Sequence, residues 1–531
     1  MSMFYINSSP IEWNKDDVPF YSIYLITQFY LPNDTERQTE IKDCLKKNLR
    51  NQGISHVYLL NEKIYTESEL GVISDRLTQV NIRGRLNYKT AFDFVELEGL
   101  QGYIIISNSD IYFDESISLL VKSDVSSKKI FLALARYNIN SSGSELDPNV
   151  SLSQDTWIYH TNFSPNVDMK TVTSFNLGTP GCDNKIAYLF AIFGYQVSNC
   201  CDQIRTYHLH QNDYRTYDRT SVIPSPYLAI EKNFCNKKST SFDHENKLFL
   251  KWLESRISSK SNFLVTRIPG IELILSHFMF VNANKTEDDG QLYEHLMPTM
   301  KNNAGIKLET KSSALSYAKK QFMALKSSHL CLKWDHRDRV YSGIIKEQNG
   351  ILKRLKCDTN WAHVLDIFNY INYQPWTTSL KRRRILIISP FVETFKKQLP
   401  HLREIYQTDL FPECSFIFLK PPQTNGQNQS REFDQELTEF IEEIRSVVDQ
   451  FDIALCSCGG YGNLVCHEIY KIGKSAIYVG GVLQMYFGVL GNRWIEETPE
   501  IVKLYSNKYW CRPSCRDKPL DFEKIENGCY W

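Results

Sequence analysis

Short apolar stretches alternate with longer amphipathic ones through the first 230 residues. The stretches 21–27, 56–60 and 102–106 are rich in Ile, Leu, Val and Tyr, which favours β-strands. A helix is predicted to begin near Asp34, because acidic residues lie in its first turns and lysines come later, as the helix dipole prefers. Strand, helix and strand in this order predict an α/β fold with a parallel sheet.

A similar pattern returns in the second half after a polar interval. Residues 233–245 lack hydrophobic periodicity, which indicates a linker between two domains, 1–235 and 240–531. The second domain is predicted to be helical over 245–380, beginning with a helix at 245–258, and α/β over 381–531. In this last part, strands are predicted at 384–391, 415–419, 452–456 and 475–479, and helices at 433–449 and 461–472. A Rossmann-like second domain follows.

Charge and composition exclude several classes of protein. The 61 basic residues balance the 61 acidic ones, so no overall field would hold a nucleic acid, and we expect no nucleic-acid partner. No stretch approaches the roughly 18 consecutive apolar residues of a membrane span, so no transmembrane segment is expected. The first residues lack the apolar core of a signal peptide. We therefore expect a cytoplasmic protein with reduced cysteines.

Two oxygen-bearing side chains follow the predicted strand 102–106. Asn108 and Asp110 lie two residues apart, so both would project to one side at the carboxyl edge of the sheet. Carboxylate and amide oxygens are the ligands that Mg²⁺ and Mn²⁺ prefer, and such an ion neutralises a diphosphate leaving group. The alternative is that Asp110 only caps a turn, as aspartate often does after a strand.

Further segments of the first domain share the pattern of one enzyme family. They are Phe29-Tyr30, Arg37 and Glu40 ahead of Cys44-Leu45-x-x-Asn48, Arg85-Leu86-Asn87-Tyr88, Asn108-Ser109-Asp110-Ile111-Tyr112-Phe113, Gln154-Asp155-Thr156-Trp157, Gly178-Thr179-Pro180-Gly181-Cys182-Asp183-Asn184 and His208-x-His210. With them, the domain resembles a family of GT-A-type glycosyltransferases that is common in giant viruses and bacteria.

This resemblance implies a site for a nucleotide-diphosphate sugar. The residues implied to bind the donor are Thr27, Gln28, Phe29, Arg37, Arg85, Tyr88, Asn108 and Asp110. Asp110 would hold the diphosphate or a divalent cation, Mn²⁺ or Mg²⁺. Asn108 replaces the first aspartate of the family's Asp-x-Asp motif, and an amide binds such an ion less tightly.

If the enzyme inverts the configuration of the sugar, it also needs a base that takes a proton from the acceptor hydroxyl, and the sequence leaves retention or inversion open. Asp155 and Asp183 are the carboxylates in polar segments late in the domain, and we prefer Asp183 because Gly178-Thr179-Pro180-Gly181 builds a defined turn beneath it. For each, the alternative is a loop carboxylate that bonds its own backbone. Trp157 is a candidate for stacking on the acceptor sugar, or else a core residue. His210 is a candidate metal or diphosphate ligand, or else structural.

In the second domain, the strongest local pattern is a glycine-rich turn after the predicted strand 452–456. Gly459, Gly460 and Gly462 precede a predicted helix whose free N–H groups suit a phosphate. An NAD site is disfavoured, because the next strand ends in Gly480-Gly481 instead of the acid that binds a ribose. The alternative is that the glycines serve only the turn.

Other segments of this domain match a second family. They are Gly473-Lys474-x-Ala476-Ile477, Gly480-Gly481-x-x-Gln484, Phe487-Gly488, Arg493-Trp494 and Glu526-x-Gly528-Cys529-Tyr530-Trp531. With the glycine-rich turn, they make residues 245–531 resemble a bacterial polysaccharide-locus family whose fold is similar to the GT-D glycosyltransferases. Of the Arg-x-Gly-Asp-Gly-Glu motif of those enzymes, Arg267 and Glu272 are kept, while Gly270 stands at the aspartate. The resemblance implies a second nucleotide-sugar site formed by Arg267, Glu272, Gly459, Tyr461, Gly462, Gly481, Gln484 and Arg493, with the two arginines on the diphosphate.

Three functions follow from these patterns. The first is a bifunctional glycosyltransferase, in which each domain transfers a sugar from a nucleotide-diphosphate sugar onto a glycan acceptor, such as a surface polysaccharide or a viral or protein glycan. The alternative is one active domain joined to a scaffold that only binds nucleotide or glycan, which Asn108 and Gly270 favour. The third, an NAD-linked sugar-modifying enzyme, requires nicotinamide binding at Gly459–Gly462.

Overall fold

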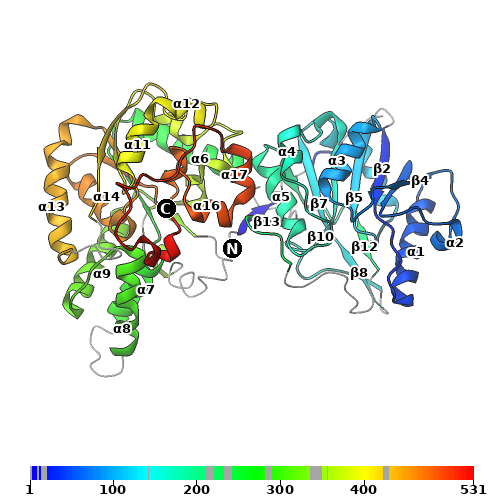
Figure 1. Cartoon of the computed structure of the whole chain (residues 1–531), viewed down its shortest axis with the longest axis horizontal. Coiled ribbons are helices and arrows are strands. Elements are labelled where there is room, and N and C mark those ends of the chain that lie inside the picture. Colours follow the sequence, from blue (N-terminus) through cyan, green and yellow to red (C-terminus); the bar gives the residue numbers. More distant parts are fainter. Residues whose placement is uncertain are drawn as a thin grey trace. The chain divides into compact units, whose positions relative to one another are not determined.

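The structure is a computed structural model that divides into two compact units, Met1–His244 and Glu245–Trp531 (Figure 1). The residues it describes are 3–8, 11–13, 21–140, 143–209, 221–232, 242–281, 290–334, 348, 350–355, 357–422 and 430–531. The polar interval in the sequence predicts two domains at 1–235 and 240–531.

The first unit is built on a seven-stranded sheet. Its strands are β2 (Ser22–Thr27), β3 (His56–Asn61), β4 (Leu77–Asn81), β5 (Gly102–Ser107), β7 (Ile130–Ala135), β10 (Gln154–His160) and β11 (Gln196–Ser198). The strand order is β11-β7-β10-β5-β2-β3-β4. Strands β4, β3, β2 and β5 are parallel, and β10 runs antiparallel to both β5 and β7. The predicted α/β class with a parallel sheet is confirmed for this unit.

Helices cover both faces of this sheet. They are α1 (Thr35–Arg50), α2 (Glu67–Leu70), α3 (Tyr88–Leu97), α4 (Val167–Thr171) and α5 (Cys182–Ile192). The side chain of Asp34 caps α1 by accepting a hydrogen bond from the Arg37 N–H at 2.7 Å. On one face, Ile41 and Leu45 of α1 pack with Leu25 of β2 in one core cluster. On the other face, Phe92 of α3 packs against Tyr159 of β10 and Phe190 of α5.

A small second sheet brings distant parts of the first unit together. It contains β6 (Ile111–Phe113), β12 (Thr206–His208), β8 (Tyr137–Asn140) and β9 (Gly143–Leu146), in that order. The segment 108–110 connects β5 of the main sheet to β6, and His208 pairs with Ile111 across the two strands. His208 is thereby placed beside Asp110. A separate parallel pair joins β1 (Met3–Asn7) to β13 (Tyr227–Glu231).

The second unit contains a seven-stranded sheet in which every strand is parallel to its neighbours. Its strands are β14 (Leu264–Arg267), β15 (Leu330–Lys333), β16 (Asp358–Trp361), β17 (Arg384–Ile388), β18 (Ser415–Leu419), β19 (Ile453–Cys456) and β20 (Ser475–Tyr478), in the order β16-β15-β14-β20-β19-β17-β18. The α/β class is confirmed here too. The region 245–380 differs from the helical expectation, because it supplies β14, β15 and β16. Each of these strands has only four residues, which is too short to show a periodicity.

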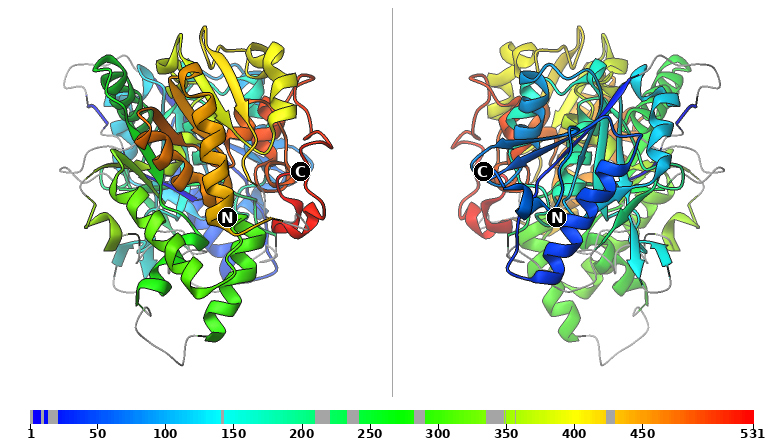
Figure 2. Two further views of the ribbon diagram at one scale, coloured as in Figure 1. Left: turned by 90° about the vertical axis from the view of Figure 1, so that its left-hand side faces the viewer. Right: turned by 90° about the vertical axis from the view of Figure 1, so that its right-hand side faces the viewer.

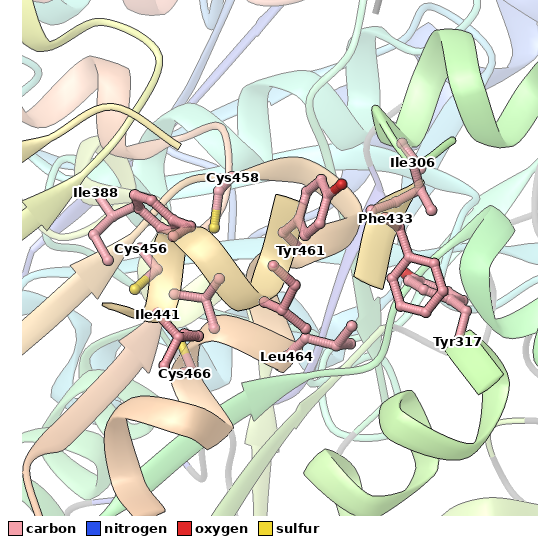
Figure 3. Close-up of a cluster of buried hydrophobic side chains, with 14 of the residues drawn as sticks. Ile306, Tyr317, Ile388, Phe433, Ile441, Cys456, Cys458, Tyr461, Leu464 and Cys466 are labelled. Carbon is pink, nitrogen blue, oxygen red and sulfur yellow. The ribbon is translucent and has the colours of Figure 1, made fainter. Parts of the chain in front are cut away.

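Helices accompany the second sheet as well, and several of them pack on it. They are α6 (Phe242–Ser258), α7 (Ile271–Val281), α8 (Gly290–Thr299), α9 (Lys311–Lys326), α11 (Val392–Gln398), α12 (Leu402–Ile405), α13 (Phe433–Ser446), α14 (Gly462–Lys471), α15 (Leu483–Tyr486), α16 (Asn492–Glu497) and α17 (Pro499–Tyr505). Helices α7, α9, α13 and α14 share one core cluster with the strands. Helix α13 is the gold-orange helix in the left view of Figure 2. Figure 3 shows Tyr461 and Leu464 in the middle of this cluster, with Cys456 on one side and Tyr317 and Phe433 on the other. No helix among the described residues has the length and apolar character that crossing a membrane requires.

The glycine-rich turn of the second unit is required for packing. A Cβ on Gly462 would lie 2.1 Å from Cε2 of Tyr478, and one on Gly459 would lie 2.6 Å from the Ala304 carbonyl oxygen. The Tyr478 hydroxyl donates a hydrogen bond to the Gly459 carbonyl at 2.8 Å, which fixes the ring. The space beside these glycines is therefore filled by the protein itself.

We expect Gly462→Ala to lower the free energy of unfolding of the second unit by about 2 kcal/mol, because the added methyl group overlaps a fixed ring. Chemical denaturation followed by tryptophan fluorescence measures this, since only Trp13 and Trp157 of the nine tryptophans belong to the first unit. Gly350→Ala is the control, because a Cβ there meets nothing within 4 Å. Equal stability of the two variants would contradict the packing role.

Candidate functional site

Seven of the residues predicted for the first unit line one cavity of about 630 Å³. They are Gln28, Arg37, Arg85, Asn108, Asp110, Asp155 and Asp183. The cavity lies where β2, β3 and β5 end, with the start of β10 and the first turn of α5 completing its wall. The carboxyl edge of a parallel sheet is the usual place for a ligand in α/β folds.

Asp110 is held by partners from two other elements. Its Oδ2 accepts a hydrogen bond from Nη2 of Arg37 on α1 and lies 3.1 Å from Nε2 of His208 on β12. Nη1 of Arg37 donates to Oε2 of Glu40 at 2.7 Å and to the Leu209 carbonyl at 3.1 Å. Burial lowers the pKa of Arg37, but the two carboxylates raise it by more, so the guanidinium stays charged.

Asp155 is likewise paired with an arginine. Its Oδ2 accepts a hydrogen bond from Nη1 of Arg136, and its Oδ1 accepts one from Nδ2 of Asn108 at 2.5 Å. Nε of Arg136 also lies 3.3 Å from Oδ2 of Asp147. Burial lowers the pKa of Arg136 and the neighbouring Asp155 raises it, with a net increase. Arg136 is not among the residues predicted from the sequence. Its one sequence signal is that it directly follows the apolar strand β7, as Asn108 and Asp110 closely follow β5.

Asp183 lies in the first turn of α5, above a turn that requires glycine. Gly178 and Gly181 have φ values of +67° and +84°, and the Cys182 N–H donates to the Thr179 carbonyl at 3.0 Å. The half-buried carboxyl group of Asp183 faces the cavity. Burial, and then the charge of Asp155, raise its pKa to about 7, although the N–H groups of the helix start lower it. It changes protonation near neutral pH.

Arg85 is an exposed cation in the cavity wall. Among the described residues, its guanidinium makes no ion pair or hydrogen bond. The side-chain amide of Gln28 holds its loop, because Nε2 donates to the Gly84 carbonyl at 3.1 Å and Oε1 accepts from the Leu86 N–H at 3.0 Å. The absence of a side chain at Gly178 leaves room for Arg85, since a Cβ there would lie 3.0 Å from Nη2.

Four other predicted residues lie in the interior. Oγ1 of Thr27 donates to the Ser107 carbonyl at 2.9 Å, which joins β2 to β5. Phe29 packs edge-on against Tyr65, with 4.9 Å between the ring centroids. Tyr88 and Trp157 are fully buried and pack against each other at 5.0 Å. In these positions the four side chains are buried and present no surface that a ligand could contact. Trp157 is therefore a core residue, which was the alternative to stacking on the acceptor sugar. His210 lies outside the described residues.

The side chains of this cavity, as placed, do not fit the divalent cation that the resemblance implies. Oδ2 of Asp110 already accepts from Arg37, and the amide nitrogen of Asn108 points to Asp155. Within the described part of the chain, no group of three or more His, Cys, Asp or Glu side chains is arranged to hold a metal ion. Hard cations require several oxygen ligands around one point.

The residues predicted for the second unit mostly contact other protein groups. Gly459 and Gly481 line a cavity of about 130 Å³, whereas ligand pockets usually measure about 300–1,000 Å³. Tyr461 and Glu272 are buried. Three further predicted residues form hydrogen bonds within the protein. Nη1 of Arg267 donates to the Val479 carbonyl at 2.7 Å. Nε2 of Gln484 donates to the Tyr530 carbonyl at 2.9 Å, and Nη1 of Arg493 donates to the Tyr530 hydroxyl at 3.2 Å.

Comparisons with known proteins give only weak structural likenesses. No protein-family model matches the chain, and no curated protein does. One similar solved structure is a mannosyltransferase from Pyrobaculum calidifontis in complex with GDP-Man and Mn²⁺, with 10% identity, a TM-score of 0.25, and 64% of this chain and 88% of that chain covered. Another is a glycosyltransferase (DUF1792) from Streptococcus sanguinis, with 12% identity, a TM-score of 0.27 and coverages of 45% and 81%. Likenesses of this size assign no activity to the chain.

Proposed function

We propose that the first unit is a glycosyltransferase that takes its donor sugar from a nucleotide-diphosphate sugar. The observation that carries this proposal is that Asp183 and Arg85 line the same cavity. The carboxyl group of Asp183 has a pKa raised to about 7, and the guanidinium of Arg85 has no ion-pair or hydrogen-bond partner among the described residues. A base and a diphosphate-binding cation are the two groups that a transfer with inversion needs, and inversion is part of the proposal. A volume of about 630 Å³ suits a ligand of this size.

The proposed reaction uses these groups in separate roles. Asp183 accepts the proton of an acceptor hydroxyl as that oxygen forms a bond to the anomeric carbon of the donor sugar. The bond between this carbon and the phosphate oxygen breaks, and the nucleoside diphosphate leaves with the electron pair. Arg85 stabilises the charge that develops on the leaving diphosphate. We propose a glycan as the acceptor.

For the second unit, we propose that it is a non-catalytic scaffold and not a second glycosyltransferase. Support comes from its small cavity and from Gly459 and Gly462, whose Cβ positions are filled by Ala304 and Tyr478. A diphosphate would have to displace these groups. The proposed enzyme therefore has one active unit, with nucleotide sugar and glycan as its partners.

The experiment is a donor panel with the purified full-length chain. With UDP-, GDP- and dTDP-sugars, we expect at least one donor to raise the melting temperature and to release its nucleoside diphosphate slowly by hydrolysis. Arg493→Ala is expected to leave this hydrolysis unchanged, because Arg493 belongs to the second unit. Absence of binding and turnover with every donor would refute the proposal. Loss of turnover in Arg493→Ala would place the reaction in the second unit and would also contradict the proposal.

A further inference from the structure

Two aspartates of the cavity, Asp110 and Asp155, each form an ion pair with an arginine. Asp110 is paired with Arg37, and Asp155 is paired with Arg136. We infer that the first unit binds the diphosphate of its donor through guanidinium groups, with Arg85 as the principal one, and works without a divalent cation. This inference rests on the proposed function.

The position of Arg37 is fixed by several bonds. Its side chain is 4% exposed and contacts Glu40 and the Leu209 carbonyl in addition to Asp110. A divalent ion bound at Oδ2 of Asp110 would have to displace this guanidinium or lie directly beside it. Two like charges a few ångströms apart repel strongly when they are withdrawn from water. The ion pair therefore competes with a metal for the same oxygen.

Asn108 is a weaker metal ligand than the aspartate it replaces. Its Nδ2 donates to Asp155, and its neutral Oδ1 is the one atom that could bind a hard cation. That oxygen would lie 3.9 Å from a Cβ placed on Gly178, and Nη2 of Arg85 would lie 3.0 Å from the same point. The amide oxygen and the Arg85 guanidinium therefore both lie within 4 Å of one point beside Gly178. Mg²⁺ and Mn²⁺ take most of their oxygens from water and from the diphosphate, so one or two carboxylates from the protein are enough to hold them. In this cavity Asp110 is the carboxylate at that position, and its Oδ2 is already bonded to Arg37.

Arg85 is suited to the role that remains. The charges of Arg37 and Arg136 are offset by carboxylates, whereas Arg85 has no such partner among the described residues. The planar guanidinium donates two parallel hydrogen bonds to phosphate oxygens, which a metal ion would otherwise coordinate. Gln28 holds the Arg85 loop at both neighbouring residues, so the cation is presented by a fixed backbone.

The test removes metals from the full-length protein. After dialysis against EDTA, turnover of the best donor of the panel is expected to stay within about twofold of its value with added Mn²⁺ or Mg²⁺, because guanidinium groups bind the diphosphate. A loss of more than about tenfold that Mn²⁺ restores would overturn the inference and leave the proposed function intact. If no donor binds or reacts with or without metal, the proposed function fails and this inference fails with it.

Two variants make the test specific to Arg85. Arg85→Met is expected to weaken donor binding by about tenfold or more, with no rescue by Mn²⁺, because it removes charge-assisted hydrogen bonds to phosphate. Arg83→Met is the matched control, since Arg83 is exposed in the same loop and does not line the cavity. Equal donor affinity of the two variants, or rescue of Arg85→Met by Mn²⁺, would overturn the role of Arg85.

Discussion

Replacing Asp183 by asparagine is expected to lower glycosyl transfer by about 10²- to 10⁴-fold, the usual contribution of a general base. Asparagine keeps the size of the side chain and its place in the first turn of α5, but it cannot accept a proton from the acceptor hydroxyl. Donor affinity should change little, because the proposed diphosphate contact is Arg85. Initial rates with a saturating donor, together with a separate measurement of donor binding, distinguish the two effects.

The pH dependence of the wild-type enzyme provides a second readout of Asp183. Only the ionised carboxylate acts as a base, so activity is expected to rise with pH through the raised pKa of about 7 and to level off above it. Asp155→Asn removes a neighbouring negative charge that contributes to this raised pKa, so its midpoint should move to lower pH. A profile without an ionisation near pH 7, or an Asp183→Asn variant of normal activity, would remove Asp183 from the reaction.

The polar segments of the cavity could be predicted because they follow patterns within the sequence. Asn108 and Asp110 come directly after an apolar strand, and the Gly178-Thr179-Pro180-Gly181 turn precedes a helix, so both mark edges of a sheet. The pairing of the carboxylates was not predictable. Arg37 meets Asp110 and Arg136 meets Asp155 only after α1, β5, β7 and β10 have packed, and no local spacing encodes those contacts.

Burial misleads a sequence-based assignment where polar and aromatic residues lie together. Trp157 follows Gln154-Asp155-Thr156, which suggests a surface segment, yet every residue of β10 is buried because the strand lies between β5 and β7. Tyr88 begins α3, which packs on a face of the sheet, and its ring is buried against Trp157. In the second unit, the glycine-rich turn has the sequence of a phosphate loop, but its glycines accommodate Ala304 and Tyr478. Only the tertiary structure distinguishes a glycine that admits a ligand from one that admits a neighbouring side chain.

Arg37→Met is expected to lower the stability of the first unit by about 3–5 kcal/mol, the usual cost of removing one partner of a buried ion pair. Its side chain is 4% exposed, and the variant removes the guanidinium that pairs with both Asp110 and Glu40. Hydrogen exchange of the amides of β5, measured as a function of denaturant, reports the stability of this unit. Lys63→Met is the control, because its ion pair with Glu69 is exposed and should contribute no more than about 1 kcal/mol.

The same variant tests whether the ion pair excludes a metal ion. Arg37→Met/Asp110→Asn should recover part of the lost stability, because one of the two buried charges is then removed. Arg37→Met removes the guanidinium that competes for Oδ2 of Asp110, so Mn²⁺ should stabilise this variant while leaving the wild type and the double variant unchanged. If Mn²⁺ stabilises the wild type equally, Arg37 and the ion do not compete for Asp110. If Arg37→Met loses no more stability than Lys63→Met, the Arg37–Asp110 ion pair contributes no more than an exposed pair. The inferred competition between buried Arg37 and a divalent ion for Asp110 would then be wrong.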